Sequence, residues 1–431
     1  MRKQIFTIIG VSLLHVSICT QAQSYDSYLL KDYQTPDIKR SSLDVKLNSQ
    51  GEFTSKDYYE ERTDQIQGEA NLDFKHYVNT RSLIGEHQVL FNLSGISLEN
   101  LKASQSKTDE LIFSASYANN YRFYTSKKCF WGLGGDVSFS YYKSKYVDAL
   151  NSKNTILGIS PLVMIGRGRI EPIQDARQAV YILDELSRKG IITERLSDDE
   201  VNRLAQLISK VKNKRFLDSR LHLIDEISNV DSFLLNNKYL KKTTAEYFTT
   251  LYDYWMNGDL FKRGSGCDVS LIIKPFYHNY KNHIDFLRTS QTGFNISVPF
   301  NYEKPVNLYW QHSANISLSG TYNHISTKAS GDETTYNWRS GIILGGYSIG
   351  YYPNTRTNLN VGISDRLLLS DEDKVRYNSA TSLTFSANYY VSPHVRISGD
   401  AGLVYENSNL YTRYSNRWSG NYSFKLTYMI F

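Results

Sequence analysis

The sequence predicts an all-β transmembrane barrel of about 14 antiparallel strands, in a range of about 12 to 16, with an α-helical insertion domain. Polar and apolar residues alternate along most of the 431-residue chain, which is the period of a strand with two different faces. Turn residues interrupt this alternation repeatedly. Between Gly166 and Gly264 the period changes to that of a helix. We therefore expect a barrel whose two halves are separated by helices.

The composition argues against an ordinary soluble enzyme. The chain has 34 Tyr and 26 Gly but only 8 Pro and 3 Cys, and its mean hydropathy is −0.43. Beyond the leading segment, no stretch approaches the roughly 18 apolar residues of a membrane-spanning helix. A transmembrane barrel is consistent with this, because only every second residue of its strands faces lipid. The net charge of +6 is spread along the chain, so we expect no nucleic-acid partner.

The N-terminus has the features of a secretory signal peptide. Arg2 and Lys3 form a charged start, residues 5–18 form an apolar core, and Ala22 completes a cleavage site with small residues. We therefore expect export and five segments. These are a signal peptide (1–22), an N-terminal periplasmic segment (23–40), a first barrel half (41–168), a helical periplasmic insertion (169–264) and a second barrel half (265–431).

The polar face of the predicted strands contains charged residues. Inside a soluble β-sandwich, which is the alternative fold, each charge would need a partner. In a water-filled barrel lumen such charges are ordinary. The predicted lumen residues are Asp73, Lys75, Asp136, Arg396, Asp400, Arg417 and Lys425.

Alternate connections between the predicted strands are short and the others are long. Outer-membrane barrels have short periplasmic turns and long outer loops. The short class includes 125–128, 303–306, 352–355 and 392–394, and the long class includes 56–64, 144–153, 324–335 and 370–376. The connection 77–86 is longer than this scheme requires. By parity the insertion belongs to the short class, so we expect it in the periplasm.

Tryptophans lie near several predicted strand ends. Trp131, Trp310, Trp338 and Trp418 have this position. Aromatic girdles of membrane barrels lie at the two membrane surfaces. We therefore expect these four side chains to form such girdles.

The insertion is expected to contain three amphipathic helices. Pro172 suits the first turn of the first helix, where its missing N–H is tolerated. Ser197 and Glu200 have the spacing of a capping box for the second helix, and the third spans about Thr243 to Met256. The apolar stripe of the first helix is Ala176, Ala179, Val180, Leu183 and Leu186, and that of the second is Val201, Leu204, Ile208, Val211, Leu217, Leu221, Ile224 and Ile227.

These features resemble outer-membrane β-barrel proteins, most closely those of the Bacteroidota. The resemblance rests on the leader ending at Ala22-Gln23, the Tyr-rich alternating strands and the C-terminal Tyr428-Met429-Ile430-Phe431. It implies a Gram-negative outer membrane and, with the helical insertion, a family of unknown function. The C-terminal aromatic residue resembles the signal that the barrel-assembly machinery reads. The implied partners are therefore that machinery, outer-membrane lipid and lipopolysaccharide.

One short segment is similar to the active-site segment of outer-membrane phospholipase A. That family uses a His, a Ser two residues later and an Asn on the next strand, and here these are His324, Ser326 and Asn337. In such a site His takes the Ser proton and Asn fixes the orientation of the His ring. By parity His324 and Ser326 share the lipid-facing side with Ile316 and Leu318. The alternative is a set of ordinary polar residues on an outer loop.

A charged cluster lies at the entry to the insertion. It consists of Arg167, Arg169, Glu171, Asp175 and Arg177. We expect these residues to anchor the insertion to the barrel rim by ion pairs, or to dock a periplasmic partner protein through 169–264.

The sequence supports no cofactor and no metal site, because no two His have metal-ligand spacing on a helix. Cys129 and Cys267 begin strands that have one strand between them. That separation of about 9 to 10 Å is too large for a disulfide.

The leading hypothesis is a porin-like, non-enzymatic channel, export or assembly component, in which the helical insertion plugs the lumen or docks a partner. A long insertion with its own helices usually has a purpose. The alternatives are a surface lipid hydrolase that uses Ser326 and a closed structural or adhesive barrel.

Overall fold

The computed structural model describes residues 25, 27–53, 63–100, 106–126, 128–146, 151–214, 222–258, 261–283, 286–329, 331–371, 375–392, 395–409 and 416–428. The expected signal peptide and the C-terminal Phe431 lie outside these residues. In the part of the chain that is described, no helix is both long and apolar enough to cross a membrane.

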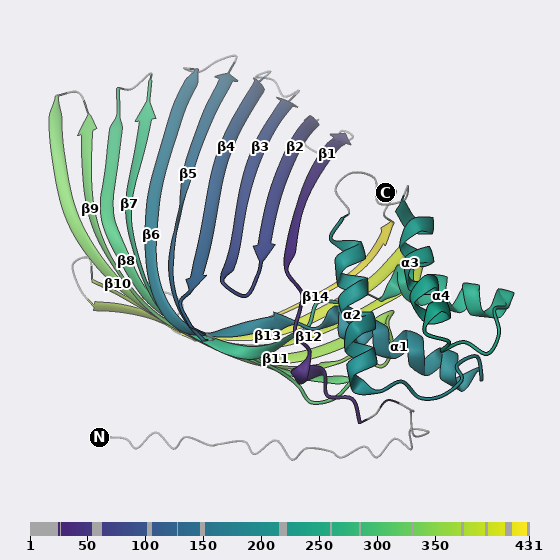
Figure 1. Cartoon of the computed structure of the whole chain (residues 1–431). Helices are drawn as coiled ribbons and strands as arrows, with labels where there is room; N and C mark the ends of the chain where they lie inside the picture. Colours follow the sequence, from purple (N-terminus) through teal and green to yellow (C-terminus); the bar gives the residue numbers. More distant parts are fainter. Residues whose placement is uncertain are drawn as a thin grey trace.

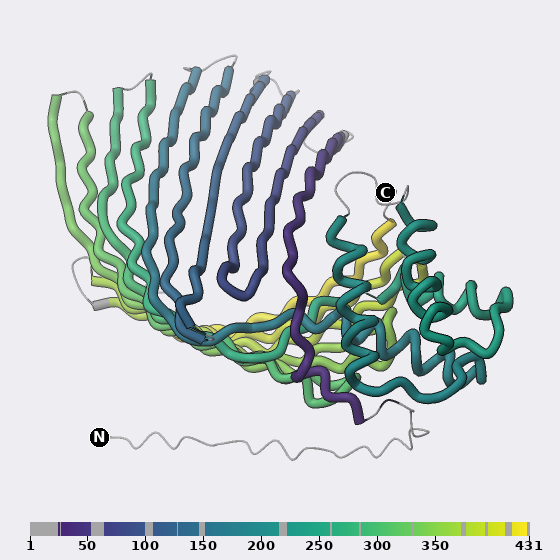
Figure 2. Tube along the Cα trace, viewed as in Figure 1, coloured from purple at the N-terminus to yellow at the C-terminus, as the bar shows by residue number. Residues whose placement is uncertain are grey.

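In the described residues, fourteen strands form one antiparallel sheet in which every strand pairs with its neighbours in the chain. They are β1 (Ile38–Phe53), β2 (Thr63–Asn79), β3 (Leu83–Asn100), β4 (Ser106–Tyr124), β5 (Cys129–Tyr146), β6 (Ser152–Pro172), β7 (Gly264–Asn282), β8 (Arg288–Pro305), β9 (Trp310–Ala329), β10 (Asp332–Tyr351), β11 (Thr357–Asp371), β12 (Val375–Ser392), β13 (Val395–Ser408) and β14 (Asn416–Tyr428). The predicted number of strands and their antiparallel order are confirmed. Figures 1 and 2 show a strongly curved sheet with the helices gathered at one end of it. Among the described residues no hydrogen-bonded pairing joins β1 to β14.

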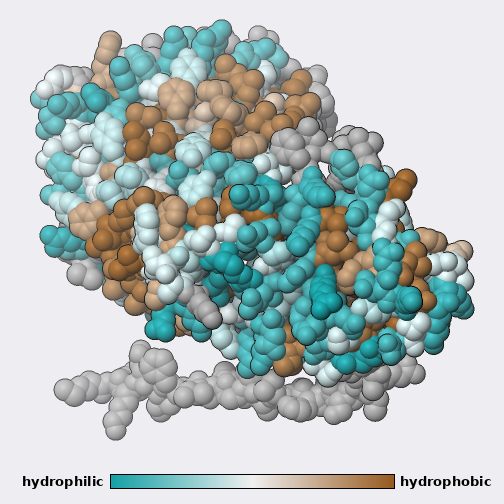
Figure 3. All heavy atoms as spheres, viewed as in Figure 1, coloured by the Kyte–Doolittle hydropathy of each residue, from teal (hydrophilic) through white to brown (hydrophobic). Residues whose placement is uncertain are grey.

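The two faces of the sheet differ in polarity, as the alternation predicts. On one face Val298, Leu318 and Ile343 lie side by side on β8, β9 and β10, and each is at least 37% exposed. On the other face Asn295 donates a hydrogen bond to Thr321, and Gln291 to the buried Asn323. We call these the apolar face and the polar face. Figure 3 shows hydrophobic residues gathered in patches over the strands, while hydrophilic residues cover much of the helical end.

Several strands are longer than the sequence predicts, because they continue into segments expected to be loops. β9 and β10 are separated only by positions 330 and 331, so the expected long loop 324–335 is mostly strand. The expectation of a loop there is wrong, because polar residues can extend a hairpin beyond its apolar part. The connection 77–86 also shortens, to residues 80–82 between β2 and β3.

Three of the four tryptophans lie in aromatic pairs near strand ends. Trp131 stacks on Phe123 with ring centroids 4.5 Å apart, and Trp310 lies 4.5 Å from Tyr351. Trp418 lies 4.9 Å from Tyr405. Trp338 differs, because it is paired with the buried Asn323 and therefore belongs to the polar face. Its predicted place in an outward girdle is wrong.

The described residues between β6 and β7 form four helices, and we call residues 173–263 the helical domain. They are α1 (Gln174–Arg188), α2 (Asp198–Lys212), α3 (Leu223–Asn236) and α4 (Ala245–Asn257). The capping box of Ser197 and Glu200 is confirmed at the start of α2. Pro172 is the last residue of β6, not the first turn of α1, because it continues the pairing with Gly264.

The expected second helix is two helices. α2 ends at Lys212 and α3 begins at Leu223, whereas Leu217 and Leu221 lie outside the described residues. Ile224 was expected in the buried stripe but is 79% exposed. A heptad-like spacing continues through this part of the sequence, but α2 and α3 are separate helices, so the two stripes belong to different helices.

The largest buried hydrophobic cluster lies in the helical domain, and it also includes the N-terminal segment. Tyr25, Tyr28, Leu30 and Tyr33 are buried against helices more than 130 residues later in the chain. The hydroxyl of Tyr28 donates to Asn202 at 2.7 Å. The residues that precede β1 therefore complete the core of the helical domain.

Candidate functional site at the short-turn end of the sheet

The helical domain is carried by the paired ends of β6 and β7, residues 166–172 and 264–270, which we call the stem. Gly168 has φ 108° and Gly266 has φ 127°. A Cβ atom on Gly168 would lie 2.1 Å from the carbonyl oxygen of Cys267, and one on Gly266 would lie 2.2 Å from that of Arg169. Only glycine permits both this backbone conformation and this close approach.

The β6 strand of the stem continues past the end of β5 toward β2 and β4, whereas Gly266 to Val269 of its β7 strand stay paired with β8. Arg169 of β6 donates to Asn79 at 2.5 Å and to the carbonyl oxygen of Thr80 at 2.9 Å, both at the end of β2. Arg122 of β4 forms an ion pair with Asp268 of β7 at 2.7 Å. Neighbouring strands are about 4.8 Å apart, so strands four positions apart are separated by roughly 19 Å along the wall. An arginine side chain cannot span that distance, so the stem itself must bend across the opening (Figure 1).

Glu171 joins three separate parts of the chain beside this crossing. Its carboxylate accepts a hydrogen bond from Thr35 at 2.6 Å and another from Arg81 at 2.8 Å. The Nε atom of Arg169 lies 2.8 Å from it, at ion-pair distance but without hydrogen-bond alignment. Glu171 therefore links the N-terminal segment, the β2–β3 turn and the stem.

A buried arginine fastens the helical domain to the β8–β9 turn. The guanidinium of Arg263 donates to the carbonyl oxygens of Leu308, Asn307 and Trp310 and to the side chain of Gln311, over distances of 2.5 to 3.1 Å. Burial, and next the charge of Arg177, lower the pKa of Arg263 to about 10. At neutral pH it is therefore still charged, and its bonds are charge-assisted.

The β10–β11 turn is held in the same way. The guanidinium carbons of Arg177 and Arg263 lie 5.5 and 4.8 Å from the ring centroid of Tyr352. Tyr181 donates to the carbonyl oxygen of Tyr352 at 3.2 Å, and Asp253 of α4 forms an ion pair with Arg356. The helical domain thus lies at the same end as the short turns, as the parity of the connections predicts.

The predicted rim cluster is only partly assembled. Arg169 and Glu171 meet in the stem, and Arg177 is fully buried in α1 over the rings of Tyr181 and Tyr352. Asp175 is buried in the first turn of α1. Arg167 is exposed on the apolar face, opposite Cys129. The exposed thiols of Cys129 and Cys267 are free, on β5 and β7 with β6 between them.

Several predicted lumen residues have partners on the polar face. Lys75 pairs with Asp73 at 3.0 Å, and Lys274 pairs with Asp136 at 2.5 Å. Asp400 accepts a bond from Ser423 at 3.3 Å. The guanidinium of Arg396 lies over the ring of Tyr390 at 5.9 Å. Arg417 and Lys425 are exposed on β14, where they face Glu406 and Ser398 in the register.

Sequence reasoning missed Arg122, Asp268, Lys274 and Arg263. The first three alternate with apolar residues of β4 and β7, so strand parity could have found them. Arg263 precedes β7, and no sequence pattern indicates its buried position.

The three candidate catalytic residues are not assembled into a triad. The Nδ1 atom of His324 lies 2.8 Å from the Oδ1 atom of Asn337. Ser326 instead donates to Glu333 at 2.6 Å. Within the described residues no hydrogen bond joins Ser326 to His324. The geometry therefore provides the His–Asn half of the predicted arrangement.

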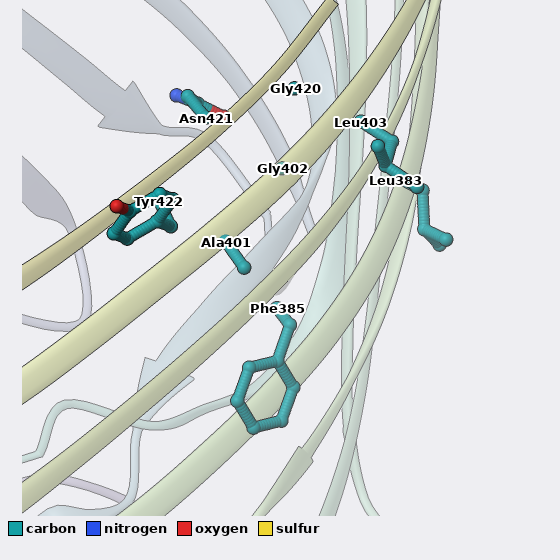
Figure 4. A pocket seen from close by; sticks show the side chains of 8 residues that line it. All are labelled: Leu383, Phe385, Ala401, Gly402, Leu403, Gly420, Asn421 and Tyr422. Carbon is teal, nitrogen blue, oxygen red and sulfur yellow. The ribbon is translucent and has the colours of Figure 1, made fainter.

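A shallow groove of about 360 Å³ lies near the C-terminal edge of the sheet (Figure 4). Leu383, Phe385, Leu403 and Tyr422 surround the small residues Ala401 and Gly420. The groove is almost entirely apolar and lies over β12, β13 and β14. Across the described part of the chain, no group of three or more His, Cys, Asp and Glu side chains is placed to hold a metal ion.

No family model and no curated protein matches this sequence. Solved structures similar to the chain include the translocator domain of the autotransporter NalP from Neisseria meningitidis, 7% identical over 92% of this chain and 88% of that one, with a TM-score of 0.24. A bacterial polysaccharide outer-membrane secretin is 9% identical over 90% and 98%, with a TM-score of 0.26. A mutant of the TodX monoaromatic hydrocarbon channel is 8% identical over 93% and 92%, with a TM-score of 0.28. TM-scores this low carry no argument about the fold, which is instead established by the strand pairing described above. The resemblance to Bacteroidota proteins stays a prediction.

Proposed function

We propose that this chain is an outer-membrane β-barrel of the channel or export type, closed at its periplasmic end by the stem and the helical domain. The observation that carries the proposal is the crossing of the stem, seen in the contacts Arg122–Asp268 and Arg169–Asn79. A connection that only joined two strands would not need to cross the opening. A long insertion with this placement is expected to control access to the lumen.

The sheet supports a position in the membrane. Its strands contain 13 to 21 residues, more than the roughly 9 to 11 needed to span a bilayer. Lipid does not tolerate an unpaired strand edge, so we propose that β1 pairs with β14 in the membrane. Because every neighbouring pair is antiparallel, the first and fourteenth strands run in opposite directions and can close the barrel.

The polar face supports an aqueous lumen. Residues of β9 on this face include Ser317, Ser319, Thr321 and Asn323, which are uncharged hydrogen-bonding groups. The charges Asp73–Lys75 and Asp136–Lys274 are paired. Such a wall suits the passage of hydrophilic solutes and gives little preference for anions or cations.

The test is single-channel conductance of the refolded protein in a planar bilayer. One variant replaces residues 174–262 by a short turn and keeps the stem, and a second replaces 169–262 and removes most of the β6 part of the stem. We expect the intact protein to be closed, the first variant to conduct partly and the second to conduct most. Phe248→Ser, on the exposed side of α4, is the control and should remain closed. Equal conductance of all four proteins would contradict the proposal.

The orientation is tested separately by labelling cysteines in intact cells. In a Cys129→Ser, Cys267→Ser background, one protein carries Phe248→Cys in α4 and another carries Gly331→Cys in the β9–β10 turn. We expect a membrane-impermeant maleimide to label only position 331. Labelling of position 248 in intact cells would place the helical domain outside.

A lipid hydrolase is the second candidate, favoured by the His324–Asn337 contact. If it is correct, the purified protein hydrolyses phospholipid and Ser326→Ala abolishes the reaction. A wild type without hydrolysis removes this candidate. If no variant conducts either, a closed structural or adhesive barrel is the remaining function.

A further inference from the structure

We propose that His76 and His87 form a two-histidine site for a divalent transition-metal ion such as Zn²⁺, Cu²⁺ or Ni²⁺. The two residues are direct partners in the register of β2 and β3. Their ring centroids are 5.0 Å apart, with 35° between the ring planes. The inference is independent of whether the barrel conducts.

The spacing fits two imidazoles on one ion. A bound Zn²⁺ lies about 2.0 to 2.1 Å from each ligating nitrogen, and a tetrahedral angle between the ligands then puts the ring centroids about 5 Å apart. Side chains at directly opposite positions have Cβ atoms about 4.5 to 5.5 Å apart. The backbone register therefore holds both rings at the required distance.

Each ring is also oriented through its other nitrogen. The Nδ1 atom of His76 lies 2.8 Å from the hydroxyl of Ser41, and the Nδ1 atom of His87 lies 3.0 Å from the hydroxyl of Tyr121. Both hydroxyls can accept the Nδ1 proton. That arrangement leaves the lone pair of Nε2 on each ring for a metal, and metal-bound histidines usually have such a partner on the second nitrogen.

Aromatic side chains surround the pair. The rings of Phe74, Tyr117 and Tyr121 lie 6.1 to 6.4 Å from that of His87. Even-numbered residues of β2 share the apolar face with Ile66, and the pair lies within a few residues of the β2–β3 turn. The site is therefore at the rim, where water can supply the remaining ligands that two histidines do not provide.

Imidazole nitrogens are ligands for Zn²⁺, Cu²⁺ and Ni²⁺, whereas Ca²⁺ and Mg²⁺ prefer oxygen. The pair would therefore discriminate against the two common hard cations. Metal binding also competes with protons for the same nitrogens, so it weakens as the pH falls.

The test uses full-length protein in detergent micelles, without an oligohistidine tag. Cu²⁺ binding is followed by electron paramagnetic resonance and Zn²⁺ binding by calorimetry. We expect one ion per chain with two nitrogen ligands, and loss of that signal in both His76→Asn and His87→Asn. His312→Asn is the matched control, because His312 also contacts a tyrosine hydroxyl, that of Tyr347 at 2.5 Å. This variant should bind as the wild type does.

Two further variants test the orientation of the rings. Ser41→Ala and Tyr121→Phe keep both histidines, and we expect each to weaken binding about 10- to 100-fold. Circular dichroism confirms that each variant is folded. If His76→Asn and His87→Asn bind the ion as the wild type does, or if the wild type binds none, the two rings are only a packed pair and the proposal is overturned.

Discussion

Two glycines set the path of the stem at the level of single residues. Gly168 of β6 pairs with Asp268, and Gly266 of β7 pairs with Ile170. Each glycine has a positive φ. In both cases the nearest atom to an added Cβ is a backbone carbonyl oxygen, which cannot rotate away. A substitution there must therefore move the backbone.

The prediction is that Gly168→Ala destabilises the closed arrangement by about 1–3 kcal/mol, the usual cost of a strained backbone residue. Urea unfolding of the helical signal measures the change. Gly320→Ala in β9 is the matched control, because nothing lies within 4 Å of its added Cβ. Equal unfolding midpoints for the two variants would show that the bend tolerates a side chain.

Short-range sequence patterns predict the roles of some residues, but they do not predict contacts between residues that are far apart in the chain. Ser197 and Glu200 were predictable because a capping box is defined by a spacing of three residues, and the stripe from Ala176 to Leu186 by the helical period. The partnership of Arg122 with Asp268 involves residues 146 positions apart. It depends on the path of the stem, which no local pattern specifies.

At the level of elements, one polar network connects all four helices. Gln178 of α1 accepts a bond from Lys212 of α2 at 2.5 Å, and the ammonium of Lys212 lies 5.4 Å from the ring centroid of Trp255 in α4. The indole N–H of Trp255 donates to the buried Glu226 of α3 at 2.8 Å. The buried carboxylate thus depends on a bond from a neighbouring helix.

Trp255→Phe removes the indole N–H that Glu226 accepts and reduces the packing volume. We expect a loss of about 1–3 kcal/mol in the stability of the helical domain, since the desolvated carboxylate loses a donor. Thermal melting of the helical signal measures it. Tyr252→Phe, on the exposed side of α4, should leave the melting temperature unchanged. A similar shift in both variants would mean that the loss is not specific to the network.

A substitution of Arg263 tests whether its hydrogen bonds to the β8–β9 turn hold the helical domain in the position that closes the lumen. Lysine keeps the charge but cannot make the forked bonds to Leu308, Asn307 and Trp310. We therefore expect Arg263→Lys to leave carbonyl groups without a donor, which costs about 1–3 kcal/mol, and to give brief channel openings in the planar bilayer. Arg188→Lys is the control, because Arg188 is exposed and forms its ion pair with Glu185 of the same helix. If Arg263→Lys stays as closed as the control, the domain is held by its other contacts.

At the level of the whole molecule, the architecture was more predictable than the contacts across it. Alternation with period two defines each strand and its two faces, and chain order then gives the antiparallel sheet. Strand ends were less predictable, because segments such as 324–329 are polar yet remain in the ladder. The meeting of the N-terminal segment with the helices also escaped prediction, since Tyr25 to Tyr33 contain no period that indicates a partner.

The tyrosines in and around the core of the helical domain, three of them from the N-terminal segment, predict that this core unfolds at alkaline pH separately from the sheet. Burial raises the pKa values of Tyr25, Tyr28, Tyr33 and Tyr247 above their ordinary value, and raises that of Tyr254 to about 12. A raised pKa means that the folded state prefers the neutral phenol. The stability from this preference is therefore complete below about pH 10, the ordinary tyrosine pKa, and is lost as the pH rises through the folded values.

We expect a late phase of tyrosinate absorbance to coincide with loss of the helical circular-dichroism signal, above about pH 11. The sheet should persist, because in lipid its backbone groups have no alternative partners. Tyr254→Phe removes one of the linked ionisations, so in that variant the transition should begin at higher pH. Two outcomes would contradict this prediction: the sheet and the helices unfold together, or all tyrosines ionise while the helices persist. In either case the helical domain does not unfold independently of the sheet. Its coupling to the sheet through Arg263 and Glu171 would then be the dominant source of its stability.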